Sequence, residues 1–152
     1  MFSWGAKMEQ ELLAVLLSAA ISLSGLPALN LLELPPILRL SHENMTKEVC
    51  PLDPASCRGM VAFFDADQQR ILIDDSLDLA LPEGSSFVVH ELVHVLQFSQ
   101  RGERMYEDCE ESVKTEAQAY QVQNAYLKKE GRLLRLRQRL AFASCSSAAR
   151  AF

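Results

Sequence analysis

The chain has 152 residues, enough for one domain with a hydrophobic core and too few for two comfortable ones. Hydrophobic residues make up 49% and charged residues 23% of it, as in globular proteins, so disorder is excluded as the default. The net charge of -5 argues against a nucleic-acid-binding protein, which normally presents a clustered basic face. We therefore expect a single globular domain over residues 1–152.

The first predicted element is a helix over residues 9–24. Its leucines recur at steps of three and four residues, as in a helix that packs on a core, and Gly25 and Pro27 end it. The same stretch has the length of the apolar part of a signal peptide, and a cleavage site could follow Ala28, but acidic residues precede it where a signal peptide carries positive charge. We favour a core helix and expect no stable membrane span. A leader is the alternative.

Short β-structure is predicted in the middle of the chain. An extended segment follows Pro36, and a loop with prolines and cysteines runs from Thr46 to Gly59. The sequence "MVAFFDADQQRILIDDSL" then has two apolar runs on either side of a polar turn at residues 67–69, which predicts a hairpin over residues 60–75. Because helices are predicted before and after these strands, the expected fold class is α+β, with a small antiparallel or mixed sheet.

Two of the three histidines lie four residues apart in "SSFVVHELVHVLQFSQ". This stretch predicts a helix over residues 85–100, on which His90 and His94 lie one turn apart on one face with Glu91 beside them. It matches the H-E-x-x-H motif, in which two imidazoles bind zinc and the glutamate handles the attacking water. Apolar residues surround the motif, so we expect the helix to be buried. Two core histidines without a metal are the alternative.

A zinc ion held by two histidines needs a third protein ligand. The next helix is predicted over residues 107–130, closed by Gly131, and it carries several acids. Glu116 shares a helix face with apolar residues such as Val113 and Leu127, where a carboxylate needs a partner. The acids near the start of the helix have another role, because negative charge there interacts favourably with the helix dipole. We therefore predict Glu116 as the third ligand and Zn²⁺ as the cofactor.

The four cysteines form no C-x-x-C pair, so a four-thiolate zinc site is not expected. Their even number allows disulfides. A Cys50–Cys57 bond would close a short loop stiffened by prolines, leaving Cys109 and Cys145 to tie two helical regions, and another helix is predicted over residues 132–142. Such pairing implies an oxidising compartment, so we favour an extracytoplasmic location, periplasmic or secreted. Four free thiols in a cytosolic protein are the alternative.

The two histidines and the glutamate of "HELVH", together with the downstream "EAQAY" that begins at Glu116, resemble the gluzincin group of zinc metallopeptidases. The short chain is most similar to minimal single-domain members of that group and to small bacterial domains of this kind. The resemblance is best over residues 60–127. It implies a zincin-like fold, in which the hairpin packs on the active-site helix. In one departure, Tyr120 stands where an aspartate usually supports a histidine ligand.

The resemblance and the chemistry imply an enzyme that cleaves a peptide or a small protein. Glu91 would take a proton from a zinc-activated water as the water attacks a carbonyl carbon, and would pass it to the leaving amine. Tyr120, His42 and Tyr106 are the candidate donors to the oxyanion. An edge strand of the hairpin would pair with an extended substrate, and a hairpin that only covers the core is the alternative.

Two non-enzymatic alternatives stay open. One is a zinc-binding module whose fourth coordination position is blocked by a side chain, and the other is a helical interaction protein without a metal. Glu91 favours the enzyme, because a purely structural zinc site needs no general base.

Overall fold

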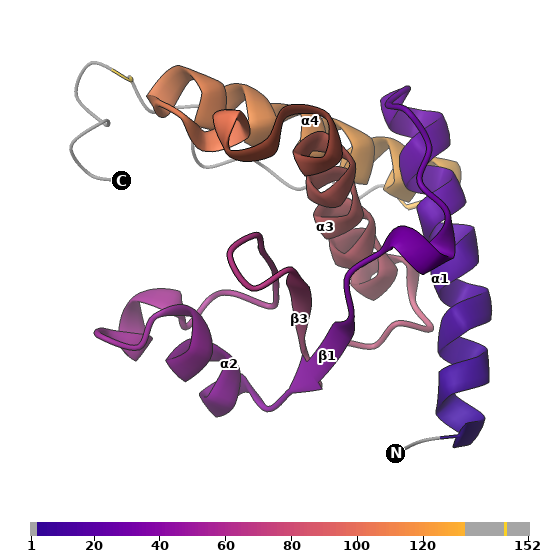
Figure 1. Ribbon diagram of the computed structural model, residues 1–152. Helices are drawn as coiled ribbons and strands as arrows, with labels where there is room; N and C mark the ends of the chain where they lie inside the picture. The colour runs from indigo at the N-terminus through magenta and orange to yellow at the C-terminus, as the bar shows by residue number, and fades with distance from the viewer. Residues whose placement is uncertain (1–2, 133–144, 146–152) are drawn as a thin grey trace.

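The computed structural model describes residues 3–132 and 145. Within them the chain forms four α-helices and one three-stranded mixed sheet, which confirms the predicted α+β class (Figure 1). The helix predicted over residues 132–142 lies outside the described residues, apart from its first position. The elements in chain order are α1 (Ser3–Ser24), η1 (Leu31–Glu33), β1 (Ile37–Leu40), α2 (His42–Val49), η2 (Pro54–Cys57), β2 (Ala62–Asp65), β3 (Arg70–Asp74), α3 (Pro82–Arg101), η3 (Gly102–Tyr106) and α4 (Cys109–Lys129).

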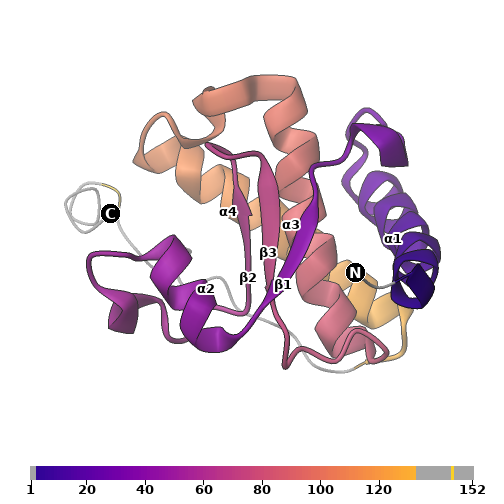
Figure 2. The ribbon, with the colours of Figure 1, turned by 60° about the horizontal axis from the view of Figure 1, so that its bottom comes forward.

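Helix α1 packs along α3 and α4 on one side of the molecule (Figures 1 and 2). It contributes Leu16, Leu17 and Ala20 to the hydrophobic core, as its leucine spacing predicts. Its last residue, Ser24, is followed by Gly25, which has a positive φ of 72° that favours glycine. In the part of the chain that the structure describes, no helix combines the length and the apolar character needed to cross a bilayer.

The sheet has the strand order β1-β3-β2, with β3 in the middle. β1 and β3 are parallel, whereas β2 and β3 form the predicted antiparallel hairpin. The three consecutive apolar residues of β3 are all buried, so both faces of the sheet are covered; they are Ile71, Leu72 and Ile73. β2 is an edge strand and lies against α3 (Figure 2).

The prediction of a loop from Thr46 to Gly59 is wrong in part, because this stretch contains the end of α2 and the turn η2. The Ser41 side chain starts α2 by accepting a hydrogen bond from the backbone N–H of Asn44. Of the residues in α2, only Met45 and Thr46 are buried. A short, mostly polar helix has little of the apolar periodicity by which helices are predicted from sequence.

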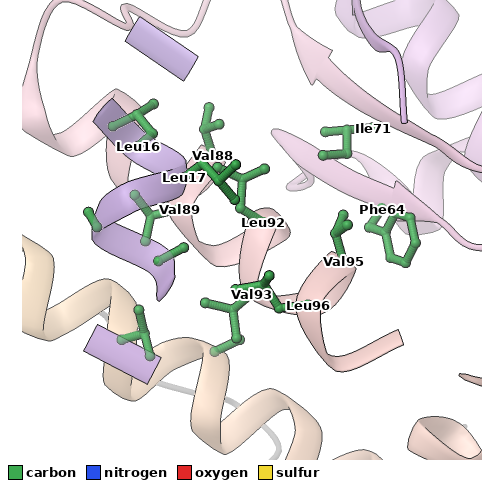
Figure 3. Packing of buried hydrophobic residues seen from close by; sticks show 14 of the residues in the cluster. Leu16, Leu17, Phe64, Ile71, Val88, Val89, Leu92, Val93, Val95 and Leu96 are labelled. Atoms are coloured by element: carbon green, nitrogen blue, oxygen red, sulfur yellow. The ribbon is translucent and has the colours of Figure 1, made fainter. Parts of the chain in front are cut away.

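Helix α3 forms the centre of the hydrophobic core, and α1, α4 and β2 all pack against it (Figure 3). It begins at Pro82, three residues before the predicted start, and proline is favoured in the first turn of a helix. Gly84 lies so close to the preceding loop that a Cβ atom would come 2.0 Å from the backbone oxygen of Asp78. The buried apolar residues of α3 are Val88, Val89, Leu92, Val93, Val95 and Leu96.

Both predicted disulfides are present. Cys50 and Cys57 join the end of α2 to η2, with their Cα atoms 6.2 Å apart. Cys109, at the start of α4, is bonded to Cys145, with a Cα separation of 5.6 Å. These separations lie in the range that disulfides span without backbone movement. Two disulfides are compatible with an extracytoplasmic protein.

Candidate metal centre

His90 and His94 lie on the buried face of α3, one helical turn apart, as the motif predicts. The side chains are almost fully buried, and their Nε2 atoms are 3.1 Å from each other. The two rings meet nearly edge to face, with their centroids 4.8 Å apart. Both imidazoles therefore present the same ring nitrogen to one point in space.

Glu116 reaches that point from α4, which packs against α3. Its Oε1 atom lies 3.2 Å from Nε2 of His90, and its Oε2 atom lies 2.9 Å from Nε2 of His94. The candidate ligand atoms of the three residues all lie within 4.8 Å of one another. The structure thus brings together the three residues that the sequence predicts as metal ligands.

The other acids of this region do not join the cluster. Glu111 forms an ion pair with Arg101, with 3.0 Å between Oε1 and the guanidinium Nη1. Glu107 and Glu110 are exposed to solvent at the start of α4 and just before it. Glu116 therefore differs from its acidic neighbours in lying on the face of α4 that packs inward, as its helical spacing from apolar residues predicts.

Two glutamines that the sequence analysis did not select hold the histidine rings. Nδ1 of His90 lies 2.9 Å from Oε1 of Gln123, and Nδ1 of His94 lies 2.8 Å from Oε1 of Gln97. The Gln97 amide nitrogen donates to the backbone oxygen of Thr115, so the amide oxygen is the atom that faces the ring. An amide oxygen can only accept a hydrogen bond. Each Nδ1 atom therefore carries a hydrogen, and Nε2 is the ring atom that faces Glu116, so the neutral form of each ring has its lone pair there.

The spacing of the cluster is compatible with a bound metal ion. Two Nε2 atoms and a carboxylate converge, and a buried carboxylate needs a protonated imidazole or a bound cation beside it. Histidine nitrogen and carboxylate oxygen are normal zinc ligands, and ligand atoms ~2.1 Å from a tetrahedral zinc lie roughly 3.4 Å apart. The separations of 2.9 to 3.2 Å between Glu116 and the two imidazoles, and between the imidazoles, are slightly shorter than that value. The His-His-Glu group could therefore hold a metal ion.

The electrostatics also favour positive charge at the centre of the cluster. Burial opposes ionisation of Glu116, but His90 and His94 outweigh it and hold the pKa of the carboxyl well below its usual range. Burial disfavours protonation of His94, but Glu116 and Glu91 outweigh it and raise the pKa of the ring. The same carboxylates stabilise either a proton or a metal ion at this point, so protons and metal ions compete for the site.

Glu91 lies beside the cluster and is nearly as buried as the histidines. Its Oε1 atom accepts a hydrogen bond of 2.8 Å from the backbone N–H of Phe64 on the edge strand β2. Glu91 also lies in the wall of a cavity that opens over the cluster, and the hydrogen bond to β2 holds it in place there. This contact is a second feature that the sequence analysis did not anticipate.

The three candidate oxyanion donors occupy different places. Tyr120 packs edge to face on His90, with 4.5 Å between the ring centroids, and lines the cavity. The Tyr106 hydroxyl lies 3.4 Å from Oε2 of Glu116, and burial together with the nearby carboxylates raises the pKa of this phenol. His42 does not fit the prediction: its Nδ1 atom pairs with Asp74 at 2.7 Å, outside the lining of the cavity.

A cavity of about 500 Å³ opens over the cluster. Three parts of the chain form it: the stretch from η2 through β2, the histidine-bearing face of α3, and the facing residues of η3 and α4. Its lining consists of Ser56, Cys57, Gly59, Met60, Val61, Ala62, Phe63, Phe64, Phe87, His90, Glu91, His94, Tyr106, Glu116, Tyr120 and Gln123.

No family model matches the chain, and comparisons with curated proteins and with solved structures find no match. Function is therefore inferred from the geometry and chemistry of the site itself.

Proposed function

We propose that the protein is a zinc-dependent hydrolase that cleaves peptide bonds, a minimal zincin-like metallopeptidase of the gluzincin type. The observation that carries the proposal is the convergence of His90, His94 and Glu116 on one point, with Glu91 in the wall of the same cavity. Three protein ligands that leave a coordination position open to a cavity are typical of catalytic zinc, whereas structural zinc usually has four protein ligands.

Each protein group has a definite role in this proposal. His90, His94 and Glu116 would hold zinc, which supplies a Lewis acid for the substrate carbonyl and for the attacking water. Glu91 accepts a proton from that water as its oxygen bonds to the carbonyl carbon. When the carbon–nitrogen bond breaks, Glu91 returns the proton to the leaving amine, so the reaction consumes one water per bond cleaved. The tyrosine hydroxyl groups at the cavity, those of Tyr106 and Tyr120, are the candidate donors to the oxyanion.

The edge strand β2 supports an extended peptide as the substrate. The backbone N–H of Asp74 donates to the oxygen of Val61, so these two residues form a hydrogen-bonded pair of the hairpin. Because such pairs alternate along an antiparallel ladder, Ala62 and Phe64 direct their backbone groups away from β3. Glu91 takes the Phe64 N–H. The N–H and C=O of Ala62 remain directed outward, where a peptide main chain can pair with them.

A zinc-binding module without activity is the second candidate, and one observation favours it. The hydrogen bond from Phe64 to Glu91 gives this glutamate a structural role, that of joining β2 to α3. A buried glutamate with such a partner needs no catalytic role to explain its presence.

Replacement of Glu91 by glutamine separates the two candidates, because the amide oxygen of Gln can still accept the hydrogen bond from Phe64. Zinc-loaded wild-type protein and the Glu91→Gln variant are incubated with denatured casein, and new termini are identified by mass spectrometry. We expect the variant to keep its zinc and its fold but to cleave about 10²- to 10⁴-fold more slowly. The matched control, Glu111→Gln, is expected to cleave at the wild-type rate. Equal cleavage by wild type and Glu91→Gln, or none by either, contradicts the proposal.

A further inference from the structure

One end of the cavity is walled by apolar side chains. Phe87 lies one helical turn before His90 on the same side of α3, and Tyr120 packs on the His90 ring. β3 leads through a loop into α3, which returns along the sheet, so β2 runs in the same general direction as α3 (Figure 2). Phe64 lies beside Glu91. Met60, which precedes β2 in the chain, therefore lies toward the Phe87 end of the cavity.

Met60 belongs to the loop of residues 50–60, which the Cys50–Cys57 disulfide cross-links and of which Ser56, Cys57, Gly59 and Met60 line the cavity. Cys57 is 7% exposed and itself lines the cavity. The backbone hydrogen bonds of this loop are local, such as the bond from the Met60 N–H to the Cys57 oxygen. Cys50, in contrast, caps α2, which is anchored by the fully buried Met45. The disulfide thus links a loop whose backbone hydrogen bonds are local to a helix that is anchored by a buried side chain.

The charge of the lining restricts what this end of the cavity can bind. Among the described residues that form the cavity, none is lysine, arginine or aspartate, and the two glutamates are Glu91 and Glu116 at the centre. A charged side chain of a ligand would have no counter-ion at the Phe87 end and would lose its hydration there. An apolar side chain would gain the free energy of leaving water.

We propose that Met60, in the loop of residues 50–60 that the Cys50–Cys57 disulfide cross-links, forms together with Phe87 and Tyr120 a subsite for a neutral apolar side chain of the substrate next to the metal centre. This inference rests on the proposed function, because it takes the centre to be the place where the substrate is held. It adds the class of side chain that is recognised and assigns the disulfide as a positioning element for that recognition.

Small hydroxamates test the subsite without any need for turnover. Acetohydroxamate chelates zinc but carries only a methyl group, 3-phenylpropionohydroxamate adds an apolar ring, and 6-aminohexanohydroxamate adds a cation. For the zinc-loaded full chain, we expect the phenyl compound to bind about tenfold to a hundredfold more tightly than acetohydroxamate. The amino compound is expected to show no such gain. Equal affinity of the phenyl compound and acetohydroxamate overturns the inference.

Variants of the loop of residues 50–60 test whether this loop causes the preference for the phenyl compound. Opening the disulfide with Cys50→Ser and Cys57→Ser should abolish most of the preference for the phenyl compound while leaving the affinity for acetohydroxamate and the zinc content unchanged. Opening the other disulfide with Cys109→Ser and Cys145→Ser is the matched control and should preserve the preference. A second variant, Met60→Glu, keeps both disulfides and should also lower the preference, which covers the case in which the loop does not fold without its cross-link.

The outcomes distinguish the two proposals. A preference that survives in both loop variants overturns the inference, whatever the activity of the protein. A zinc-loaded protein that shows the preference but cleaves no peptide supports the subsite and contradicts the proposed catalytic function. A protein that takes up no zinc and binds no hydroxamate overturns both.

Discussion

Nδ1 of His90 lies 2.9 Å from the side-chain oxygen of Gln123, and the amide nitrogen of the same glutamine donates to the Ser86 hydroxyl at 3.1 Å. Gln123 is fully buried. This hydrogen bond places the ring hydrogen on Nδ1 and turns Nε2 toward Glu116. A glutamine on α4 thus orients the first histidine of the cluster.

Removal of this support should weaken the metal centre. We expect Gln123→Leu to lower the affinity for zinc by about 10- to 100-fold, because the His90 ring loses the partner that fixes its tautomer and orientation. Gln123→Glu, which keeps an acceptor for the ring, should restore most of the affinity. Competition with a chromophoric chelator measures both variants. Gln121→Leu, at an exposed position of the same helix, is the control and should bind zinc as the wild type does.

A side chain at Gly84, in the first turn of α3, should clash with the loop that precedes the helix. A Cβ atom there would lie 2.0 Å from the backbone oxygen of Asp78, which cannot move without displacing the chain. We expect Gly84→Ala to lower the free energy of unfolding by about 1–3 kcal/mol, as overpacking does. Gly59→Ala is the control, because a Cβ atom at Gly59 meets nothing within 4 Å. Urea unfolding that gives the same loss for both variants would show that the close approach of Asp78 is not the cause.

Asp74 should make the stability of the protein depend on acid pH. Burial opposes ionisation of this carboxyl, but hydrogen bonds from Ser76 and His42 outweigh it and hold its pKa below the usual range. A depressed pKa in the folded state means that the stabilisation is complete above the unfolded pKa, near ~4, and is lost as the pH falls through the folded value.

We therefore expect Asp74→Asn to be less stable than the wild type by about 2 kcal/mol at pH 7 and to approach it as the pH falls below about 4. Urea unfolding at a series of pH values measures this difference. Asp75→Asn, at the exposed neighbouring position, is expected to show no such convergence. A difference between wild type and Asp74→Asn that stays constant from pH 7 to pH 3 contradicts this account of Asp74.

The parts of the site that sequence predicts are those fixed by periodicity. His90 and His94 are paired by helical spacing, and Glu116 is selected because it lies among inward-facing residues of α4. The two disulfide pairings also follow from the chain, since the short Cys50–Cys57 loop leaves one remaining pair.

The parts that sequence does not predict depend on contacts between distant segments. Gln97 is a polar residue on an apolar helix, and its role becomes visible only with Thr115 on α4 as its second partner. His42 has no recognisable partner in sequence because Asp74 lies 32 residues away. The same amide nitrogen of Gln97 also donates to the side-chain oxygen of Gln118 on α4. Spacing finds the buried faces of helices but does not show which polar groups meet between them.

The most direct test of the metal centre is the zinc content and zinc affinity of the purified protein and of two variants on α4. We expect one zinc per wild-type chain, and an affinity in Glu116→Gln that falls by more than the ~10- to 100-fold typical of losing an outer contact, because a neutral amide replaces a ligand. Glu110→Gln, exposed on the same helix, should bind zinc as the wild type does. Unchanged zinc affinity in Glu116→Gln, or an equal loss in Glu110→Gln, contradicts the assignment of His90, His94 and Glu116 as a metal centre.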